Sequence, residues 1–222
     1  MTRPIARTRI RLAALIACLG LAWQPSIATA ADEDTQFWLN GIVTGEIAED
    51  TAITIDATQR FREERDGDQH TLRVMIDREV ADELDLGGGI GVFETQGGLT
   101  EIRVTQQATY TPGRFALRTR LEERFFDGAD RVELRFRQRV HYNHPIAEKW
   151  RGTVGVEWLA LVQPRDADRG PQTDQWRFQA ILSHKLADNL DVGAIYWLVV
   201  SPRGPREDRI NHIPQAALTW RF

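Results

Sequence analysis

The sequence predicts an all-β fold, namely a single antiparallel, up-and-down transmembrane β-barrel of about 10–12 strands with a polar lumen rich in Arg and Glu. Three observations predict it. Apolar and polar residues alternate with period two from residue 37 onward, turn-forming residues recur at regular intervals, and the last strand carries aromatic residues on one face. Helical membrane spans are excluded, because this chain of 222 residues has no run of about 20 apolar residues.

The N-terminus predicts a secretory signal peptide over residues 1–30, which leaves residues 31–222 for the outer-membrane β-barrel. The apolar run over residues 12–23 is too short to anchor the chain, and Ala28-Thr29-Ala30 is a small-x-small site, so we expect cleavage after Ala30. A lipoprotein signal ending at Cys18 is the alternative, although it leaves a shorter apolar run. The arginines that open the segment are Arg3, Arg7, Arg9 and Arg11.

Cleavage changes the charge and the chemistry of the chain. It removes four of the 28 basic residues and none of the 32 acidic ones, so the exported chain has a net charge of −8. It also removes the only cysteine, which excludes disulfides and cysteine-ligated metal sites. An acidic chain is a poor nucleic-acid binder, because nucleic acid requires a positive surface.

The alternation is clearest over residues 131–141. Val132, Leu134 and Phe136 alternate there with arginine and glutamate, as in a strand whose two faces meet different environments. The same pattern recurs, in chain order, over residues 53–62, 72–77, 84–95, 115–125, 151–160 and 175–182.

The turns between these segments are of two kinds. One set is short, as around residues 47–50 and 186–189, and the other holds longer connections, such as residues 164–173 and 201–208. Short turns on one rim and longer loops on the other are typical of outer-membrane barrels. About eleven strand-like segments result, and the first, over residues 37–46, would run in the same direction as the last. The sequence therefore leaves open the path of residues 37–46 and the number of strands.

We expect the apolar face to point outward into lipid. The last strand places Leu218, Trp220 and Phe222 on one face, which resembles the assembly signal of bacterial outer-membrane barrels. The charged face is rich in arginine, an unusual choice for a solvated surface. The alternative is a soluble barrel or sandwich with its apolar residues inside. Tryptophans toward the strand ends suggest an interfacial girdle formed by Trp38, Trp150, Trp158, Trp176, Trp197 and Trp220.

The order of the segments resembles an uncharacterised family of bacterial outer-membrane proteins, the domain-of-unknown-function family 2490. The resemblance covers residues 37–222 and implies a signal peptide and an outer-membrane β-barrel, but no activity and no catalytic residues. The residues that carry it are Glu101-Ile102-Arg103 with Gln106-Gln107, Leu117-Arg118-Thr119-Arg120-Leu121-Glu122-Glu123-Arg124, Glu133-Leu134-Arg135-Phe136-Arg137 and Asn143-His144-Pro145-Ile146.

The charged face is expected to form a ladder of cross-strand Arg–carboxylate pairs that largely fills a narrow lumen. A narrow anion-preferring channel, or a site for an acidic ligand, is the alternative, because rings of arginine favour anions. The ladder comprises Arg60, Arg62, Arg73, Arg103, Arg118, Arg120, Glu122, Arg124, Glu133, Arg135, Arg137, Arg139, Arg151, Glu157 and Arg177.

No catalytic residue, cofactor or metal site is expected. Ser183 and His184 are adjacent and point to opposite faces of a strand, and no spacing brings Ser201 to His212. The five histidines lack the spacing of metal ligands. An outer-membrane enzyme acting on lipid or peptide at the extracellular rim is a second alternative. Its local candidates for a protease-like site are Asp66, Asp68 and His70.

The sequence thus predicts a monomeric, integral protein of the outer membrane of a Gram-negative bacterium, with an unknown specific role and a structural, salt-bridged lumen. Its expected partners are outer-membrane lipid and, through the C-terminal strand, the barrel-assembly machinery.

Overall fold

The computed structural model describes residues 32–62, 67–129 and 131–222, and all regular structure in these ranges is β-strand. None of the described residues belongs to a helix that could cross a membrane. The expected signal peptide over residues 1–30, with its cleavage site after Ala30, lies outside the described residues. The strands are β1 (Asp32–Thr35), β2 (Phe37–Ala48), β3 (Thr51–Phe61), β4 (Gln69–Ala81), β5 (Leu84–Thr95), β6 (Glu101–Tyr110), β7 (Phe115–Phe126), β8 (Glu133–Ala147), β9 (Trp150–Gln163), β10 (Gln172–Ala187), β11 (Leu190–Arg203) and β12 (Arg206–Arg221).

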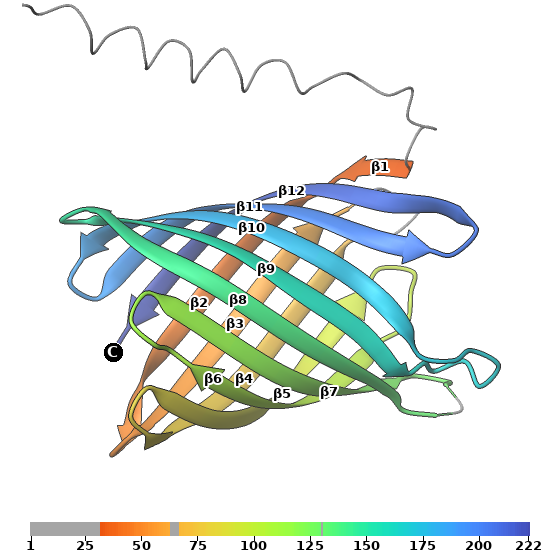
Figure 1. Ribbon diagram of the computed structural model, residues 1–222, viewed down its shortest axis with the longest axis horizontal. Coiled ribbons are helices and arrows are strands. Elements are labelled where there is room, and N and C mark those ends of the chain that lie inside the picture. The colour runs from red at the N-terminus through yellow and green to blue at the C-terminus, as the bar shows by residue number, and fades with distance from the viewer. Residues whose placement is uncertain (1–31, 63–66, 130) are drawn as a thin grey trace, which may run out of the picture. The chain divides into compact units, whose positions relative to one another are not determined.

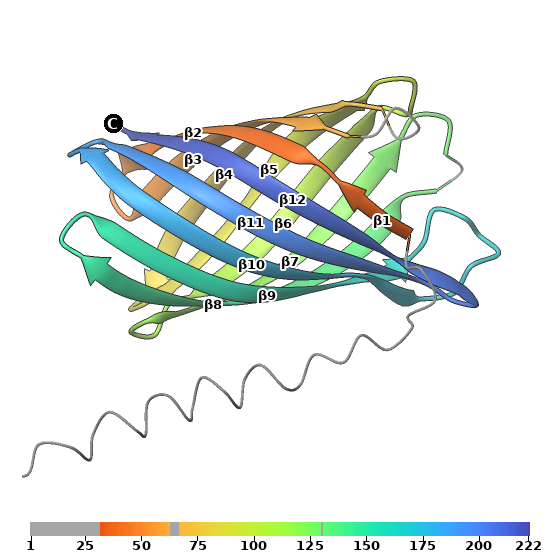
Figure 2. The ribbon, with the colours of Figure 1, turned by 90° about the horizontal axis from the view of Figure 1, so that it is seen from above.

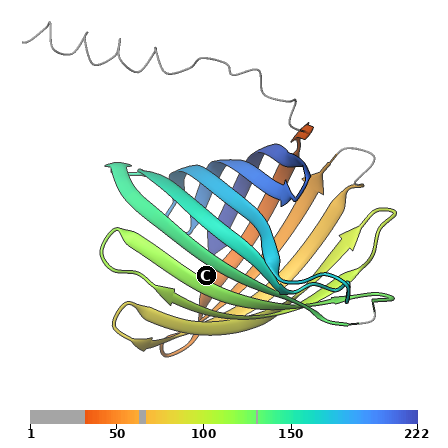
Figure 3. The same ribbon diagram turned by 45° about the vertical axis from the view of Figure 1, so that its right-hand side comes forward.

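Strands β2 to β12 form a single sheet that closes into a barrel (Figure 1, Figure 3). Strands that follow one another in sequence pair antiparallel, and β12 then pairs with β2 in parallel, from Gln215 opposite Trp38 to Arg221 opposite Thr44. The short strand β1 also pairs in parallel with β12, next to β2. The predicted up-and-down β-barrel of 10–12 strands is therefore confirmed, with eleven strands in the closed wall.

The parallel closing pair follows from the odd number of strands. An up-and-down chain with an odd number of strands ends in the direction in which it began, so its first and last strands can meet only in parallel. The segment whose path stayed open in the sequence is β2, and it lies directly beside β12. Among the described strands, the parallel pairs that β12 makes with β1 and β2 thus depart from the expected antiparallel arrangement.

The two ends of the barrel differ in their connections (Figure 2). The turns after β2, β4, β6, β8 and β10 lie at the end that holds the C-terminus, and four of these five turns have only two residues. At the other end, the connections after β3, β5, β7 and β9 have five to eight residues. The connection after β11 differs from the expected long loop, because β11 and β12 continue as strands to a two-residue turn at residues 204–205.

Apolar side chains cover the outside of the barrel and charged side chains fill its inside. In the described ranges, thirty-two large hydrophobic residues are exposed and seven are buried, whereas the buried polar or charged set has sixteen members. In β8, for example, Arg135 and Arg137 are buried while the alternating residues Leu134 and Phe136 face outward. This distribution is the reverse of a soluble barrel and confirms the predicted Arg/Glu-rich lumen.

Two glycines on the inner face leave room for larger lumenal side chains. A Cβ atom at Gly87 of β5 would collide with the Asp77 carboxylate of β4, and one at Gly155 of β9 would collide with the His141 ring of β8. Glycine at these positions therefore lets long polar side chains lie flat against the neighbouring strand.

Candidate functional site: a buried arginine–carboxylate belt

Glu122 of β7 is the centre of the charged network in the lumen. Its side chain is 0% exposed, and Arg135 of β8 donates two N–H groups to its Oε2 at 2.6 and 2.8 Å. Arg137 donates to Oε1 at 2.6 Å, and the guanidinium groups of Arg103 and Arg120 lie 3.6 and 3.8 Å from the same oxygen. One carboxylate therefore faces four guanidinium groups, which is the arrangement that a buried ionised glutamate needs.

Glu157 of β9 extends the network across the neighbouring strands. Arg137 spans the two glutamates, because its Nη2 lies 2.7 Å from Glu157 Oε2 while its Nη1 bonds Glu122. Arg118 of β7 reaches Glu157 Oε1 at 2.9 Å. Both oxygens of Glu157 are thus occupied, and the side chain is only 2% exposed.

Toward the long-loop end, Glu101 of β6 receives two arginines. Arg103 lies 2.7 Å from its Oε1, and Arg124 binds it with both Nε at 2.8 Å and Nη2 at 2.9 Å. Arg124 also pairs with Glu133 at the start of β8. The ion pairs on β6 to β10 therefore form one continuous network, which we name the charged belt.

The register of the strands decides which charges pair. Arg124 lies directly opposite Glu133, and Glu122 directly opposite Arg135, as expected of a cross-strand ladder. At other positions two arginines lie directly opposite each other, so each of them can reach a carboxylate only along a diagonal between the strands. The opposed arginines are Arg103 and Arg124, Arg118 and Arg139, and Arg120 and Arg137.

Three arginines around one internal cavity, which we name the surplus arginines, have no carboxylate oxygen within 4.0 Å in the described part of the chain: Arg60, Arg139 and Arg177. Arg60 donates to Gln69 at 2.8 Å and Arg177 to Gln175 at 2.5 and 2.8 Å, so these hydrogen-bond partners are neutral amides. Arg139 has no hydrogen bond to a described residue, and the Nε atoms of Arg60 and Arg139 are buried without a partner.

The surplus arginines and the belt line one internal cavity of ≈ 420 Å³. Eleven of the described residues around this cavity are arginine and only two, Asp56 and Glu101, are acidic. The most buried carboxylates of the belt, on Glu122 and Glu157, do not line it. The space inside the barrel is therefore strongly positive, although the chain as a whole is acidic.

The opposite wall of the lumen is apolar. Trp38 of β2, Val199 of β11 and Ile213 of β12 form a buried cluster, against which Trp197 packs with its ring 6.2 Å from that of Trp38. The indole N–H of Trp38 donates to Gln36 at 3.2 Å, which satisfies its polar atom. Apolar packing therefore fills the lumen beside the closing seam, where β12 pairs with β2.

The expected tryptophan girdle is therefore wrong for two of its members. Trp38 and Trp197 line the internal cavity, because the parity of β2 and β11 turns them inward. Trp38 also lies beneath the guanidinium of Arg60 at 4.2 Å. The remaining girdle candidates are not in the buried cluster; they are Trp150, Trp158, Trp176 and Trp220.

Three further ladder residues lie away from the belt. Arg73 pairs with Asp56 at 3.2 Å on the β3–β4 side of the lumen. Arg62 follows β3 and donates its backbone N–H to Asp68 at 3.1 Å. Arg151 is exposed and belongs to a second cavity, at the short-turn end.

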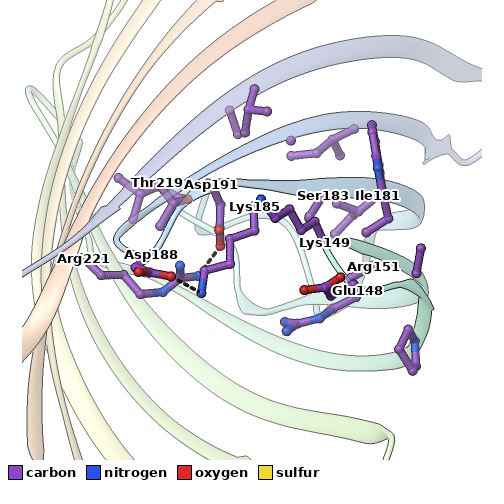
Figure 4. Close-up of a pocket in the computed structure, with 18 of the residues that line it drawn as sticks. Glu148, Lys149, Arg151, Ile181, Ser183, Lys185, Asp188, Asp191, Thr219 and Arg221 are labelled. Carbon is purple, nitrogen blue, oxygen red and sulfur yellow. Dashed lines mark ion pairs between the residues drawn. The ribbon is translucent and has the colours of Figure 1, made fainter.

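This second cavity has a volume of ≈ 630 Å³ and is lined by mixed charges (Figure 4). Lys185 pairs with Asp188 at 3.0 Å and Arg221 with Asp191 at 2.5 Å, while Arg151 lies on the opposite side of the view. The hydrogen bond and the charge of Lys185 lower the pKa of Asp188 in the turn after β10. The lining of this cavity is therefore less positive than that of the belt cavity.

The predicted C-terminal assembly signal lies on the outer face of β12. Leu218, Trp220 and Phe222 are all exposed, and the rings of Trp220 and Phe222 are 6.0 Å apart. The Phe222 amide donates to the Thr44 carbonyl at 3.1 Å, and its ring covers Gly45 of β2, where a Cβ would collide. This row of three residues is accessible on the outer surface of the barrel, and its role in assembly stays a prediction.

The residues considered for a hydrolase site are not brought together. Ser183 lines the short-turn cavity, whereas His184 packs its ring 4.2 Å from that of Trp150. The register places Ser201 opposite Arg209 rather than His212, and His212 instead hydrogen-bonds Tyr196 at 2.6 Å.

The protease-like candidates also remain separate. Asp66 lies outside the described residues, Asp68 accepts the Arg62 amide, and His70 is an exposed residue of β4. Within the described ranges, no group of three or more His, Cys, Asp or Glu residues could hold a metal ion.

Several residues of the lumen were not predicted from the sequence. Asp174 lies 3.1 Å from Arg135 because a β-bulge at the start of β10 turns it inward, and no sequence signal marks that bulge. Leu159 and Leu161 are buried beside the belt. Both lie an even number of residues from Glu157 on the same strand, so the period-two alternation predicts that they point inward as Glu157 does.

Comparison with known proteins adds the family. Residues 35–210 match the model of a family described as "Protein of unknown function (DUF2490)". The chain belongs to this family. It is also 28% identical over 193 residues to an uncharacterized protein of Methylorubrum extorquens, covering 82% of this chain and 83% of that protein. Membership of the DUF2490 family agrees with the resemblance that the belt residues carry, and it adds no activity.

Proposed function

We propose that this DUF2490 protein is an integral β-barrel of the bacterial outer membrane, with a structural role and a lumen closed by the charged belt. The observation that carries the proposal is the reversed distribution of side chains, with thirty-two large hydrophobic residues exposed and the ion pairs buried. A lipid environment removes that apolar surface from water, whereas an aqueous compartment would leave it exposed.

The two kinds of connection support an orientation. Outer-membrane barrels turn short connections toward the periplasm and long loops toward the exterior. The turn at residues 188–189 would then be periplasmic and the loop at residues 164–171 external. We propose export through the signal peptide of residues 1–30, a monomeric state, contact with outer-membrane lipid, and recognition of the β12 outer row by the barrel-assembly machinery.

Cysteine labelling tests both location and orientation, because the sequence contains no cysteine after Cys18. We expect Asp168→Cys, in the long loop, to react with a membrane-impermeant maleimide on intact cells, and Asp188→Cys to react only after lysis. Recovery of the protein in the soluble periplasmic fraction, without heat-modifiable gel migration, would contradict the proposal. The reverse labelling pattern would contradict the orientation alone.

A second candidate function is a narrow anion-preferring channel, favoured by the eleven arginines around the belt cavity. Planar-bilayer recording separates the two. A closed lumen gives no steady conductance from purified barrel, whereas a channel gives anion-selective conductance that Arg139→Gln reduces. The control is Arg114→Gln, because Arg114 lies outside the belt, in the turn before β7.

We propose no catalytic role. Ser183 and His184 have different surroundings, and His212 pairs with Tyr196 rather than with a serine. An unchanged lipid profile in a deletion strain is the expected result, and an altered lipid A would favour the enzyme alternative.

A further inference from the structure

We propose that the belt cavity is a binding site for a small multivalent oxyanion of the phosphate class. The inference goes beyond the proposed structural role and does not depend on the location of the barrel. It is carried by the surplus arginines, whose charge the described carboxylates leave unmatched.

The shortage of carboxylate is visible around Glu157. Arg139 of β8 and Arg177 of β10 lie directly opposite Glu157 on its two neighbouring strands. Both Glu157 oxygens are nevertheless taken by other arginines, Arg118 at 2.9 Å and Arg137 at 2.7 Å. The two residues best placed to pair with Glu157 therefore have no carboxylate partner among the described residues.

The orphaned atoms point to a missing acceptor. Nε of Arg139, Arg60 and Arg118 is buried with no hydrogen-bond partner in the described structure. Arg60 and Arg118 each keep one acceptor through another nitrogen, Gln69 and Glu157 respectively, whereas Arg139 has none among the described residues. A buried guanidinium without an acceptor loses hydration and gains nothing in return, which is among the costliest arrangements in a protein. An anion in the cavity would offset that loss, because it supplies acceptors to several arginines at once.

The geometry of the donors selects the chemical class. Guanidinium groups present planar pairs of N–H donors that match the oxygens of phosphate and carboxylate ions, and halides lack that match. The cavity of ≈ 420 Å³ lies in the range of small-molecule sites, so it admits a compact oxyanion with its remaining hydration. Several converging arginines favour a multivalent anion over a monovalent one.

A path to the site exists from the short-turn end. Asn40, Ile42 and Ile195 line both the belt cavity and the short-turn cavity, so the two cavities adjoin. Arg151 and Lys185 lie around the outer one and would attract an anion toward the inner one.

Calorimetric titration of the purified, folded barrel with inorganic phosphate tests the site. We expect saturable binding of about one phosphate per barrel, and Arg139→Gln or Arg177→Gln should each weaken it about tenfold, since each removes charge-assisted hydrogen bonds. Arg114→Gln is the control, because Arg114 lies in the turn before β7 and lines neither cavity, and it should bind as the unaltered protein does. No binding, or an equal loss in Arg114→Gln, would overturn the proposal.

Thermal unfolding gives a second readout that a purely structural role would not produce. In phosphate-free buffer Arg139→Gln should unfold at a higher temperature than the unaltered protein, because it removes an uncompensated buried charge, and a given phosphate concentration should stabilise it less than the unaltered protein. A lower unfolding temperature, failure of both glutamine variants to reach the heat-modifiable folded form, or equal stabilisation by chloride at matched ionic strength would each overturn the site.

These outcomes are separate from those of the proposed function. Phosphate binding by a protein recovered in the soluble fraction would contradict only the membrane location. If the protein is recovered in the outer membrane but does not bind phosphate, only the proposed anion site is contradicted.

Discussion

The two walls of the lumen are filled by opposite chemistry. On β6 to β10, the charged belt buries Glu122 and Glu157 among arginines, while on β2, β11 and β12 the cluster around Trp38 and Ile213 is apolar. The belt lies where every strand has antiparallel neighbours, and the apolar cluster lies at the parallel closing seam. Arg60 of β3 lines the belt cavity and covers the Trp38 ring with its guanidinium at 4.2 Å.

Each wall contributes a different kind of stabilisation. Ion pairs are directional and fix which side chains meet across a register, whereas apolar packing is non-directional and tolerates a seam whose pairing differs from the rest. The belt should therefore depend steeply on individual residues, and the seam on the volume that its side chains fill.

The largest expected effect is that of Glu122→Gln. It leaves Arg135 and Arg137 short of a buried counter-charge, so the free energy of unfolding should fall by about 3–5 kcal/mol. Urea unfolding of barrel refolded in lipid vesicles measures this effect. The matched control is Glu94→Gln, an exposed residue of β5, which should change the free energy by less than about 0.5 kcal/mol. Equal effects would mean that the belt is not the more sensitive wall.

A smaller effect is expected at the seam. Ile213→Val removes one methylene from a side chain that is 2% exposed, and the free energy of unfolding should fall by about 1 kcal/mol. The same measurement on Ile146→Val, at an exposed site, should show little change in that free energy. A loss as large as that of Glu122→Gln would contradict the proposed tolerance of the seam.

The smallest effect is expected at Arg73. Its ion pair with Asp56 spans 3.2 Å, but the Arg73 side chain is 26% exposed, so water screens the pair. Arg73→Gln should cost less than about 1 kcal/mol, and the cost should shrink at high salt. A loss comparable to that of Glu122→Gln, independent of salt, would show that burial does not set the strength of these pairs.

The sequence predicted the barrel class, a wall of 10–12 strands and a charged inner face, and it left open whether the strand number is odd or even. Period-two alternation is a property of single strands, so residues such as Arg135 and Arg137 can be assigned to one face without knowing their neighbours. The inward positions of Leu159 and Leu161 follow from the same parity. The excess of arginine over carboxylate on the inner face also follows from the sequence, because it depends only on composition and on which residues alternate inward.

Which charges meet depends on how the strands are assembled. Pairing depends on register between strands, and a diagonal contact such as Arg137 with Glu157 has no signature in either strand alone. The bulge that brings Asp174 to Arg135 and the parallel closure that turns Trp38 toward Trp197 likewise arise between strands. The identity of the three arginines without a carboxylate partner is therefore set by the tertiary structure, because an arginine is left unpaired only when its neighbours have taken the available carboxylates.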